Sequence, residues 1–457
     1  MSLQIVILAA GQGKRMLSQT PKVLHRVAGK PMLTRVVETA QQLNPDAIHV
    51  IYGNGGDKIR QALPDLAVNW VLQEKQLGTG HAVLQALPYI PTSSQVLILS
   101  ADVPLIQAQT LRALIDCNEQ RHTLNLLLAI VENPTGLGRI IRNNQGEVRA
   151  IMEERDATDA QKEIKEIYSG ICCAQAADLA RWLPVLNNHN AQGEYYLTEI
   201  ISLAVAENLP IVSLQATDSS EIQGVNDRVQ LHQLERIWQQ NYARKLLLSG
   251  VTIADGNRLD VRGNLQCGQD VFIDVNTVFG GEVVIGSGSR IGPNCVLHNV
   301  QIGEHCEILA NSVLENCEIG NHCHVGPFAR LRPGTKLGDD CKIGNFVETK
   351  NALFAQGSKA SHLSYLGDVD IGKEVNIGAG TITCNYDGAN KHQTVIEEGA
   401  FIGSDTQLVA PVIVGAYATV GAGSTIRKNV PPGELTLTES KQKTIVGWKR
   451  PIKKDSQ

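Results

Sequence analysis

The chain has 457 residues, of which 19% are charged and 4% aromatic, and its formal net charge is -5. This length predicts two or three domains rather than a single core. A negative net charge argues against a nucleic-acid-binding protein, because such proteins hold phosphates with basic surfaces. No run of 18 apolar residues predicts a membrane span, and Met1 leads into a strand-like segment rather than a signal peptide. We therefore expect a soluble, cytosolic protein.

The first predicted element is a buried parallel strand at residues 3–10, an apolar run that ends in small residues. A glycine-rich loop follows at residues 11–15 (GQGKR). Its glycines let backbone N–H groups approach a phosphate chain, while Arg15 and Lys22 add positive charge. The loop matches neither a Walker loop nor a dinucleotide fingerprint, since Met16 replaces the third glycine of the latter. A phosphate site is the prediction, and a purely structural turn is the alternative.

Strand and helix patterns then alternate to about residue 225, which predicts an open, doubly wound α/β sheet. Ligands of such sheets bind at the carboxyl ends of the strands, and residues 73–80 form one loop there. Asp102 directly follows an apolar strand, so its carboxylate is a candidate Mg²⁺ ligand beside a nucleotide. The alternative role for Asp102 is to cap a helix. The clearest predicted strands are residues 47–53, 69–74, 95–102 and 124–131.

Residues 225–249 contain neither glycine nor proline, and their apolar residues keep roughly helical spacing: Leu231, Leu234, Trp238 and Leu246. They predict one long helix that connects two domains. A repeat of a different period begins after this helix, which places a domain boundary here.

Between about residue 273 and residue 426, an aliphatic residue recurs at steps of six positions, with occasional five-residue steps, and often has glycine after it. This period fits neither an α-helix nor a plain strand and is typical of the hexapeptide parallel β-helix. About eight to ten coils are expected, with glycines giving each corner its backbone freedom. Periodicity does not fix the handedness, but hexapeptide-repeat acyltransferases, which the segment resembles, coil left-handed. The positions are Ile285, Ile291, Leu297, Ile302, Ile308, Leu314, Ile319, Val325, Leu331, Leu337, Ile343, Ile396, Ile402, Leu408, Val414, Val420 and Ile426.

The chain has ten cysteines and no C-x-x-C pair. Those in the repeat are expected to be reduced thiols that fill the coil as small apolar residues. His305 and Cys306 lie about one coil from His322, Cys323 and His324, so these side chains are a candidate zinc site. Stacking of polar turn residues is the favoured interpretation of this cluster.

The end of the chain is basic, with KRPIKK at residues 449–454 after Pro431-Pro432-Gly433 breaks the repeat. One interpretation of these residues is a solvated tail. The other is a segment that closes over a negatively charged ligand.

Longer motifs resemble those of one family, and the N-terminal string LAAGQGKRM…PKVL by itself resembles the sugar-nucleotide pyrophosphorylases. Together the motifs resemble the bacterial bifunctional N-acetylglucosamine-1-phosphate uridylyltransferase/glucosamine-1-phosphate acetyltransferases over nearly the whole chain. This resemblance implies a Rossmann-like nucleotidyltransferase domain at residues 1–227, a linker helix at 228–249, and a left-handed parallel β-helix acetyltransferase domain with a tail at 250–457. It also implies a homotrimer through the β-helix. The motifs are NPTGLGRI (133–140), GEYYLTEII (193–201), GVNDR (224–228), FARLRPG (328–334), GNFVETK (344–350) and IGAGTITCNYDGANK (377–391).

By this resemblance, the N-terminal half joins UTP to N-acetylglucosamine 1-phosphate and releases pyrophosphate. The reaction needs no protein nucleophile, because Arg15, Lys22 and Mg²⁺ spread the charge that develops on the phosphates. The implied metal ligands are Asp102 and Asn226. Leu8, Ala9, Ala10 and Gly11 would line the nucleotide, Lys22 would meet phosphate, Gln73, Gly78 and Thr79 would read the uracil, and Gly138, Glu153 and Tyr168 would hold the sugar.

Two residues of this half depart from the family pattern. Ser100-Ala101 precedes Asp102 where the family usually has Tyr-Gly, and Tyr168 stands where it usually has a sugar-contacting Asn. Tyr168 can still form a hydrogen bond, but its size raises the question of the shape of the acceptor pocket.

The same resemblance implies that the C-terminal half acetylates glucosamine 1-phosphate from acetyl-CoA. Acyl transfer to an amine needs a base, and the ordinary pKa of histidine suits His362 to that role near neutral pH. Glu348 would orient its ring. Arg332 and Lys350 lie about one coil apart, so both can reach one phosphate. Tyr365 and Asn376 match sugar contacts, and Ala379, Asn385, Tyr386, Ser404 and Ala422 match coenzyme contacts.

Glu439 departs from the family too, because an Arg often stands there for the coenzyme; Lys441 is a candidate substitute. Two rival functions remain. A single-activity pyrophosphorylase with a structural β-helix would not need His362 beside Arg332 and Lys350. A non-catalytic scaffold, like the exchange-factor subunits of translation initiation, would not need the cations of the loop or Asp102.

Overall fold

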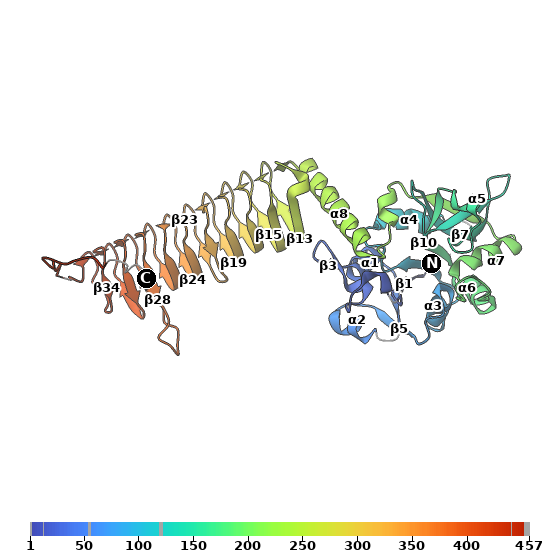
Figure 1. Ribbon diagram of the computed structural model, residues 1–457, viewed down its shortest axis with the longest axis horizontal. Helices are drawn as coiled ribbons and strands as arrows, with labels where there is room; N and C mark the ends of the chain where they lie inside the picture. The colour runs from blue at the N-terminus through green and yellow to red at the C-terminus, as the bar shows by residue number, and fades with distance from the viewer. Residues whose placement is uncertain (1, 12, 54–55, 118–121, 440, 452–457) are drawn as a thin grey trace, which may run out of the picture. The chain divides into compact units, whose positions relative to one another are not determined.

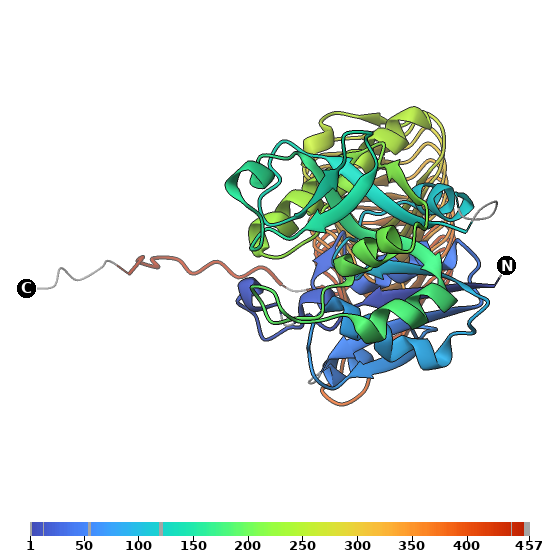
Figure 2. The same cartoon turned by 90° about the vertical axis from the view of Figure 1, so that its right-hand side faces the viewer.

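The computed structural model describes residues 2–11, 13–53, 56–117, 122–439 and 441–451. The chain divides into two compact units, Met1–Asn241 and Tyr242–Gln457. Figure 1 shows the first as helices packed around a sheet and the second as a ladder of short strands, and Figure 2 shows the helices and sheet of the first unit from another side. In the described part of the chain, no helix has the length and apolar character needed to cross a membrane.

A nine-stranded sheet forms the centre of the first unit, in the order β11-β7-β10-β6-β1-β4-β5, with β8 and β9 as a hairpin beside β10. β1 pairs in parallel with β4 and β6, whereas β10 runs antiparallel to β6 and β7, so the sheet is mixed. Its strands are β1 (Leu3–Leu8), β4 (Ala47–Gly53), β5 (Asn69–Gln73), β6 (Gln95–Ser100), β7 (Leu124–Ile130), β8 (Gly138–Arg142), β9 (Val148–Met152), β10 (Glu166–Gln175) and β11 (Ile211–Gln215). A separate short pair is β2 (Arg26–Val27) and β3 (Lys30–Pro31).

Alternate residues of the central strands enter two different cores. Ile5 and Ile7 of β1 pack with residues of α1 and α4, whereas Val6 packs with residues of α3, α6 and α7. Strand side chains alternate between faces, so helices cover both faces of the sheet. This confirms the predicted doubly wound class. The helices are α1 (Met32–Gln41), α2 (Asp57–Ala62), α3 (Thr79–Ala86), α4 (Ala108–Asp116), α5 (Asp159–Lys162), α6 (Ala176–Trp182) and α7 (Ile200–Ala206).

The long helix predicted at residues 225–249 is α8 (Arg228–Leu248). Leu234 in its first part belongs to a small core cluster with Met16, Val27 and Met32. In its last part, the hydroxyl of Tyr242 accepts a hydrogen bond from the amide of Leu265 and donates one to the carbonyl of the same residue, both at 3.0 Å. Each end of the helix is thus fixed to its own unit.

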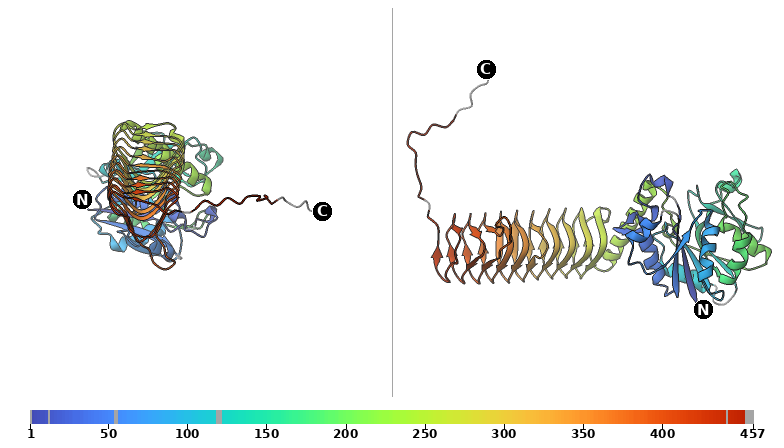
Figure 3. Two further views of the ribbon diagram at one scale, coloured as in Figure 1. Left: turned by 90° about the vertical axis from the view of Figure 1, so that its left-hand side faces the viewer. Right: turned by 90° about the horizontal axis from the view of Figure 1, so that it is seen from below.

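The second unit is a β-helix built from two long parallel sheets, consistent with the left-handed coil that was predicted (Figure 3). The eleven-stranded sheet contains β12 (Thr252–Ile253), β14 (Phe272–Ile273), β16 (Arg290–Ile291), β18 (Glu307–Ile308), β20 (His324–Val325), β23 (Lys342–Asn345), β25 (Lys359–His362), β27 (Asn376–Ile377), β30 (Phe401–Ile402), β33 (Thr419–Val420) and β35 (Leu435–Thr436). The thirteen-stranded sheet contains β13 (Leu259–Cys267), β15 (Thr277–Ile285), β17 (Val296–Ile302), β19 (Val313–Ile319), β21 (Arg330–Leu331), β22 (Lys336–Leu337), β24 (Glu348–Phe354), β26 (Tyr365–Ile371), β28 (Ile382–Cys384), β29 (Thr394–Ile396), β31 (Gln407–Val409), β32 (Val412–Val414) and β34 (Thr425–Ile426).

All the aliphatic positions of the six-residue repeat are buried, none more than 5% exposed, as predicted. The coil begins earlier than the predicted residue 273, because β12 already pairs with β14. Ile253, Leu259 and Leu265 also lie six apart, but the spacing changes before Ile273 and hides the first coil in the sequence.

The predicted role of most repeat glycines is wrong. At the corners, the left-handed backbone conformation is taken mainly by other residues, such as Asn294 and Asn311, with φ of 59° and 60°. The glycines are required instead by the close approach of neighbouring coils. A Cβ added at Gly286 would lie 2.5 Å from the carbonyl carbon of Gly303, and one at Gly303 would lie 2.7 Å from that of Gly320. Glycine therefore lets the backbones of stacked turns touch.

In the candidate zinc cluster, two histidine side chains lie on the surface of the coil and two cysteine side chains lie in its interior. The rings of His305 and His322 are exposed and stack with their centroids 5.3 Å apart. Cys306 and Cys323 are fully buried, and their thiols contact carbonyl oxygens of the next coil. No group of three metal-binding side chains occurs among the described residues. The stacked-turn interpretation accounts for these residues.

Candidate active sites

A cleft of about 620 Å³ opens at the carboxyl edge of the sheet in the first unit. β1, β5 and β6 all end there because they run in the same direction. The residues predicted for nucleotide, phosphate and metal binding lie together in its lining: Leu8, Ala9, Ala10, Gly11, Arg15, Lys22, Gln73, Gly78, Thr79, Asp102 and Asn226.

Lys22 lies between the two predicted metal ligands. Its ammonium group pairs with Asp102 and donates a hydrogen bond to Oδ1 of Asn226 at 3.0 Å. Ser100, in the position where the family pattern differs, donates to the other oxygen of Asp102 at 2.7 Å. Oxygens from Asp102 and Asn226 therefore converge on one cation. The residues present fit a divalent metal ion, for which carboxylate and amide oxygens are suitable ligands.

The glycine-rich loop is held against Lys22 by Gly13. Gly13 has φ +60°, and a Cβ added there would lie 2.7 Å from Cβ of Lys22. A larger residue would both strain the backbone and displace Lys22. Gln12 lies outside the described residues.

The loop after β5 is fixed by the segment around Tyr195. Buried Gln73 donates from Nε2 to the carbonyl of Gly78 at 3.0 Å. Gly78 has φ +110°, and a Cβ there would lie 2.6 Å from the carbonyl oxygen of Tyr195. The hydroxyl of Thr79 accepts a hydrogen bond from the amide of Leu197 at 3.0 Å. The geometry of this part of the cleft is thus set by residues far apart in the sequence.

The three predicted sugar-binding residues form a second group: Gly138 begins β8, Glu153 directly follows β9, and Tyr168 lies on β10. Tyr168 lies directly opposite Gly138 in the sheet. A Cβ added at Gly138 would lie 3.8 Å from Oε1 of Glu153, which accepts a hydrogen bond from Thr198 at 3.0 Å. Burial raises the pKa of Glu153 above its ordinary value, although the bond from Thr198 opposes this.

The large side chain of Tyr168 is accommodated in the hydrophobic core. Its side chain belongs to the hydrophobic cluster on one face of the sheet and is 7% exposed. Burial raises the pKa of its hydroxyl well above the ordinary value, so the group is protonated. Tyr168 thus forms part of the floor beneath Gly138 and Glu153.

Several residues that were not predicted as site residues also line the cleft: Lys14, Gln76, Arg155, Gln192 and Glu194. Gln76 donates a hydrogen bond to the carbonyl of Ala10, across the end of the sheet. Lys14 belongs to the glycine-rich loop at residues 11–15, and Glu194 belongs to the motif GEYYLTEII at residues 193–201. Gln76 lies in the loop predicted at residues 73–80, whereas nothing local in the sequence marks Arg155.

The second unit gathers three cations on the surface of the β-helix. Arg332 pairs with Glu348 at 2.8 Å. Lys391 lowers the pKa of Lys350 below its ordinary value, and Arg332 lowers it further. Lys391 was missed in the sequence because it lies on residues 385–393, a loop that interrupts the ladder after β28 and projects from the coil in Figure 1. Like charges this close to one another favour an anion between them.

His362 ends β25 and is exposed. Its register partner on the preceding coil is Asn345, whose Oδ1 lies 3.3 Å from Nδ1 of His362. The contact predicted from Glu348 to this ring is replaced in the structure by the ion pair of Glu348 with Arg332. Glu348 lies about one coil from both His362 and Arg332, so the spacing in the sequence allows either pair. The side of the coil on which each residue lies determines that Glu348 pairs with Arg332.

The other predicted contacts of the acetyl-transfer site lie on the same coils. Tyr365 is the register partner of Glu348, and Asn376 lies one coil beyond Lys359 on β27. A Cβ added at Gly367 would lie 2.5 Å from the hydroxyl of Tyr365 and 2.9 Å from the amide nitrogen of Asn385. Glycine at 367 therefore allows Tyr365 and Asn385 to meet.

The predicted coenzyme residues lie toward the end of the coil. Ala379, Ser404 and Ala422 occupy the same corner of successive coils, joined by backbone hydrogen bonds such as that from Asp405 to Ala379 at 2.7 Å. Asn385 and Tyr386 begin the projecting loop, and Tyr386 is 61% exposed. Glu439 is exposed, as are Lys441, Lys449 and Arg450 of the tail; residues 452–454 lie outside the described residues.

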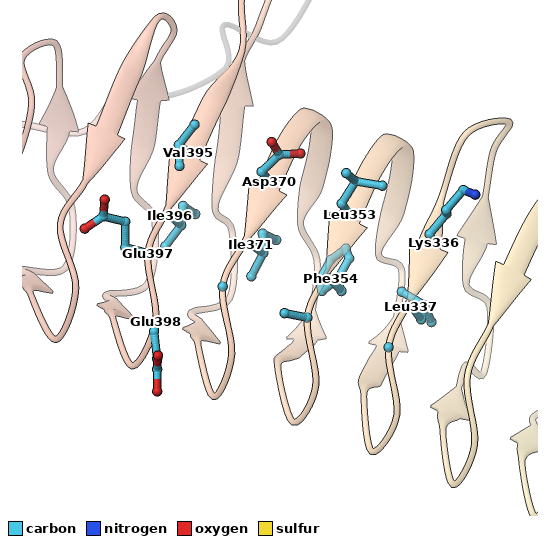
Figure 4. Close-up of a pocket in the computed structure, with 13 residues that line it drawn as sticks. Lys336, Leu337, Leu353, Phe354, Asp370, Ile371, Val395, Ile396, Glu397 and Glu398 are labelled. Carbon is cyan, nitrogen blue, oxygen red and sulfur yellow. The ribbon is translucent and has the colours of Figure 1, made fainter.

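A groove of about 610 Å³ runs along one face of the same unit (Figure 4). Lys336, Leu353, Asp370 and Val395 point outward from successive coils, while Leu337, Phe354, Ile371 and Ile396 point inward. Leu353 is 45% exposed, so part of this face is apolar.

Comparison with known proteins places both units. The family of MobA-like NTP transferase domains matches residues 5–135. The GMPPB C-terminal domain matches residues 261–355, and the bacterial transferase hexapeptide, six repeats, matches residues 393–428.

Whole-chain relatives decide the family. The bifunctional protein GlmU of Legionella pneumophila strain Corby is 68% identical over 100% of both chains. The chain belongs to the bifunctional GlmU family. The GlmU of Marinobacter nauticus is 53% identical over 99% of both chains. A solved UDP-glucose pyrophosphorylase with UDP-glucose aligns with 53% of this chain and 100% of that chain, but its 14% identity and TM-score of 0.43 carry no argument.

Membership of the GlmU family makes this protein an enzyme with two activities on small-molecule substrates. The first unit is a nucleotidyltransferase, a class that generally uses a divalent metal ion. The second is a hexapeptide-repeat transferase. The cleft with Asp102 and Asn226 is the candidate site of the first activity, and the coils around His362 are that of the second.

Proposed function

We propose that this protein makes UDP-N-acetylglucosamine in two steps. The second unit transfers acetyl from acetyl-CoA to the amine of glucosamine 1-phosphate, and the first unit then joins the product to UTP and releases pyrophosphate. The observation that carries the proposal is that one chain, 68% identical to a bifunctional GlmU, has a cleft lined by the predicted nucleotide and phosphate residues and, on its second unit, a separate cluster of three cations.

In nucleotidyl transfer, the residues of the cleft hold UTP and the sugar phosphate in line for the reaction. Leu8 to Gly11 line the nucleotide, and Gln73, Gly78 and Thr79 read the uracil. Arg15 and Lys22 hold the phosphates. Gly138 and Glu153 hold the sugar, whereas Tyr168, predicted as a third sugar contact, is buried in the core. The phosphate oxygen of the sugar attacks the α-phosphorus while the bond to pyrophosphate breaks. Positioning and electrostatics carry the rate.

Asp102 and Asn226 are proposed to hold Mg²⁺. When bound, the ion supplies positive charge that stabilises the phosphate oxygens. Lys22 contacts both residues in the structure and would meet phosphate with a metal ion bound to them.

In acetyl transfer, His362 is proposed to take the proton of the sugar ammonium, and the free amine attacks the thioester carbonyl as the thiolate of coenzyme A leaves. Asn345 accepts a hydrogen bond from Nδ1, so Nε2 is the basic nitrogen. Arg332, Lys350 and Lys391 surround the phosphate, Glu348 holds Arg332, and Tyr365 and Asn376 contact the sugar. Ala379, Asn385, Tyr386, Ser404 and Ala422 are proposed to contact the coenzyme, with Lys441 in place of an arginine at Glu439.

We also propose a homotrimer through the β-helix, because the groove in Figure 4 exposes apolar side chains on a regular face.

A cytoplasmic location is proposed because all ten cysteines are free thiols. Domain limits at residues 1–227, 228–249 and 250–457 are proposed for the two activities and the helix between them.

The two half-reactions test the proposal separately. Purified protein given UTP, N-acetylglucosamine 1-phosphate and Mg²⁺ should release pyrophosphate. Given glucosamine 1-phosphate and acetyl-CoA, it should release free coenzyme A thiol. Failure of either reaction with a folded, pure protein would remove that activity from the proposal.

Replacing Lys391 tests the cation cluster. Lys391→Met should raise the KM for glucosamine 1-phosphate about tenfold, the effect of losing one charge-assisted hydrogen bond. Because Lys391 lowers the pKa of Lys350, its loss should also move the alkaline rise in this KM to higher pH, where Lys350 gives up its proton. Steady-state kinetics across pH 7 to about 10 measures both effects. Lys342→Met, an exposed lysine on β23, is the control; an equal effect there would contradict a specific phosphate site.

A further inference from the structure

Arg139 carries a guanidinium group behind the strand that presents Gly138, and its side chain is only 1% exposed. Burying a charge is costly unless partners compensate it. The contacts of this guanidinium group therefore indicate its role. None of them takes part in the mechanism proposed above.

One guanidinium group joins three segments of the chain. Nη1 donates to the carbonyl of Leu137, in the loop before β8. Nη2 donates to the carbonyl of Lys162, at the end of α5, at 3.3 Å. The same nitrogen pairs with Oε2 of Glu154, just after β9, at 2.6 Å. A planar fork with several fixed donors suits Arg to such a junction.

Glu154 extends the junction to the turn before β8. The pKa of its carboxyl lies below the ordinary value: desolvation raises it, but the amide of Gly136 and the guanidinium of Arg139 together lower it by more. The carboxylate is therefore charged at neutral pH. Leu137 in turn donates from its amide to the carbonyl of Pro134 at 3.1 Å, which closes the turn.

The pair lies one residue along the chain from two proposed sugar contacts. Gly138 precedes Arg139, and Glu153 precedes Glu154. In the antiparallel hairpin, Arg139 lies opposite Met152, so the pair joins the two strands at the end where Gly138 and Glu153 meet. Any shift of the pair moves both contacts.

We propose that Arg139 and Glu154 are positioning residues that set the geometry of the acceptor-sugar wall formed by Gly138 and Glu153. The inference rests on the proposed function, and it assigns the pair to binding of N-acetylglucosamine 1-phosphate rather than of UTP. The nucleotide end of the cleft is fixed by a different set of contacts, from Gly78 and Thr79 to residues 195–197.

The decisive variant is Glu154→Gln, which keeps the length of the side chain and removes its charge. The KM for N-acetylglucosamine 1-phosphate should rise about tenfold, because small displacements of binding groups are costly. The KM for UTP and the rate of acetyl transfer should stay within about twofold. Glu154 is 29% exposed, which limits the effect of the substitution on folding.

The same strand offers a matched control. Arg142 pairs with Glu166 at 2.6 Å, toward the other end of β8 and away from Gly138. Glu166→Gln removes the same charge from the same hairpin region and should leave both KM values unchanged. A structural weakening of β8 would affect both variants.

Calorimetric titration with N-acetylglucosamine 1-phosphate decides the inference even without turnover. A tenfold weaker affinity for Glu154→Gln alone supports it, and Arg139→Lys, which keeps the charge but loses the fork, should weaken binding in the same way. Equal losses for UTP and sugar phosphate, or equal effects of Glu154→Gln and Glu166→Gln, would overturn it. Absence of uridylyl transfer in the unaltered protein would instead count against the proposed function.

Discussion

Asp102→Asn should lower the rate of uridylyl transfer by about 10²–10³-fold while leaving acetyl transfer unchanged. The substitution keeps the size of the side chain and its capacity to accept the hydrogen bond from Ser100, but it removes the negative charge. Asp102 and Asn226 would then offer a metal ion two neutral oxygens, and the ion pair with Lys22 would also be lost. Pyrophosphate release measures the first activity, and coenzyme A thiol release measures the second.

Asp116→Asn is the control for this prediction, because Asp116 is an exposed carboxylate at the end of α4 in the same unit. It should leave both rates unchanged. Equal loss of the two activities in a folded Asp102→Asn protein would contradict separate sites. Partial recovery of uridylyl transfer at high Mg²⁺ concentration would show that the lost group is a metal ligand.

His362→Ala should lower acetyl transfer by about 10²-fold or more at neutral pH, the usual contribution of a general base. Uridylyl transfer should stay at its normal rate. Higher pH should partly restore the variant, because the ammonium group of the substrate then loses its proton without help. Thiol release measured against pH gives both results.

His324→Ala serves as the matched control, since His324 is also exposed on the β-helix and pairs there with Glu307. Asn345→Ala should have a smaller effect than His362→Ala, because Asn345 only holds Nδ1 of the ring. An unchanged rate in His362→Ala at neutral pH would remove this residue from the role of base.

The fold was predictable where its cause is local. The six-residue ladder predicted which side chains are buried, because the period of the repeat is the geometry of the coil itself. The role of the glycines was predicted wrongly because the residues that leave no room for a side chain lie one coil away. A Cβ at Gly286 would meet Gly303, and no local pattern in the sequence shows this contact. The first coil was missed because the spacing changes between Leu265 and Ile273.

The candidate sites were predictable where strand ends or motifs place a residue. Asp102 lies two residues after the end of β6, and ligands of parallel sheets bind at the carboxyl ends of the strands, so Asp102 reaches the cleft with Lys22. Contacts that depend on how loops fold back were not predictable. Lys391 reaches Lys350 only because its loop returns to the coil. Glu348 pairs with Arg332 rather than with His362 because of the side of the coil on which each residue lies.

The central claim is that one chain carries out both steps. Mass spectrometry tests it on purified protein given glucosamine 1-phosphate, acetyl-CoA, UTP and Mg²⁺, with each omitted in turn. The account predicts UDP-N-acetylglucosamine only when all four are present. Nucleotide sugar formed only from pre-acetylated sugar phosphate, or acetylated sugar phosphate that accumulates without nucleotide sugar, would contradict it.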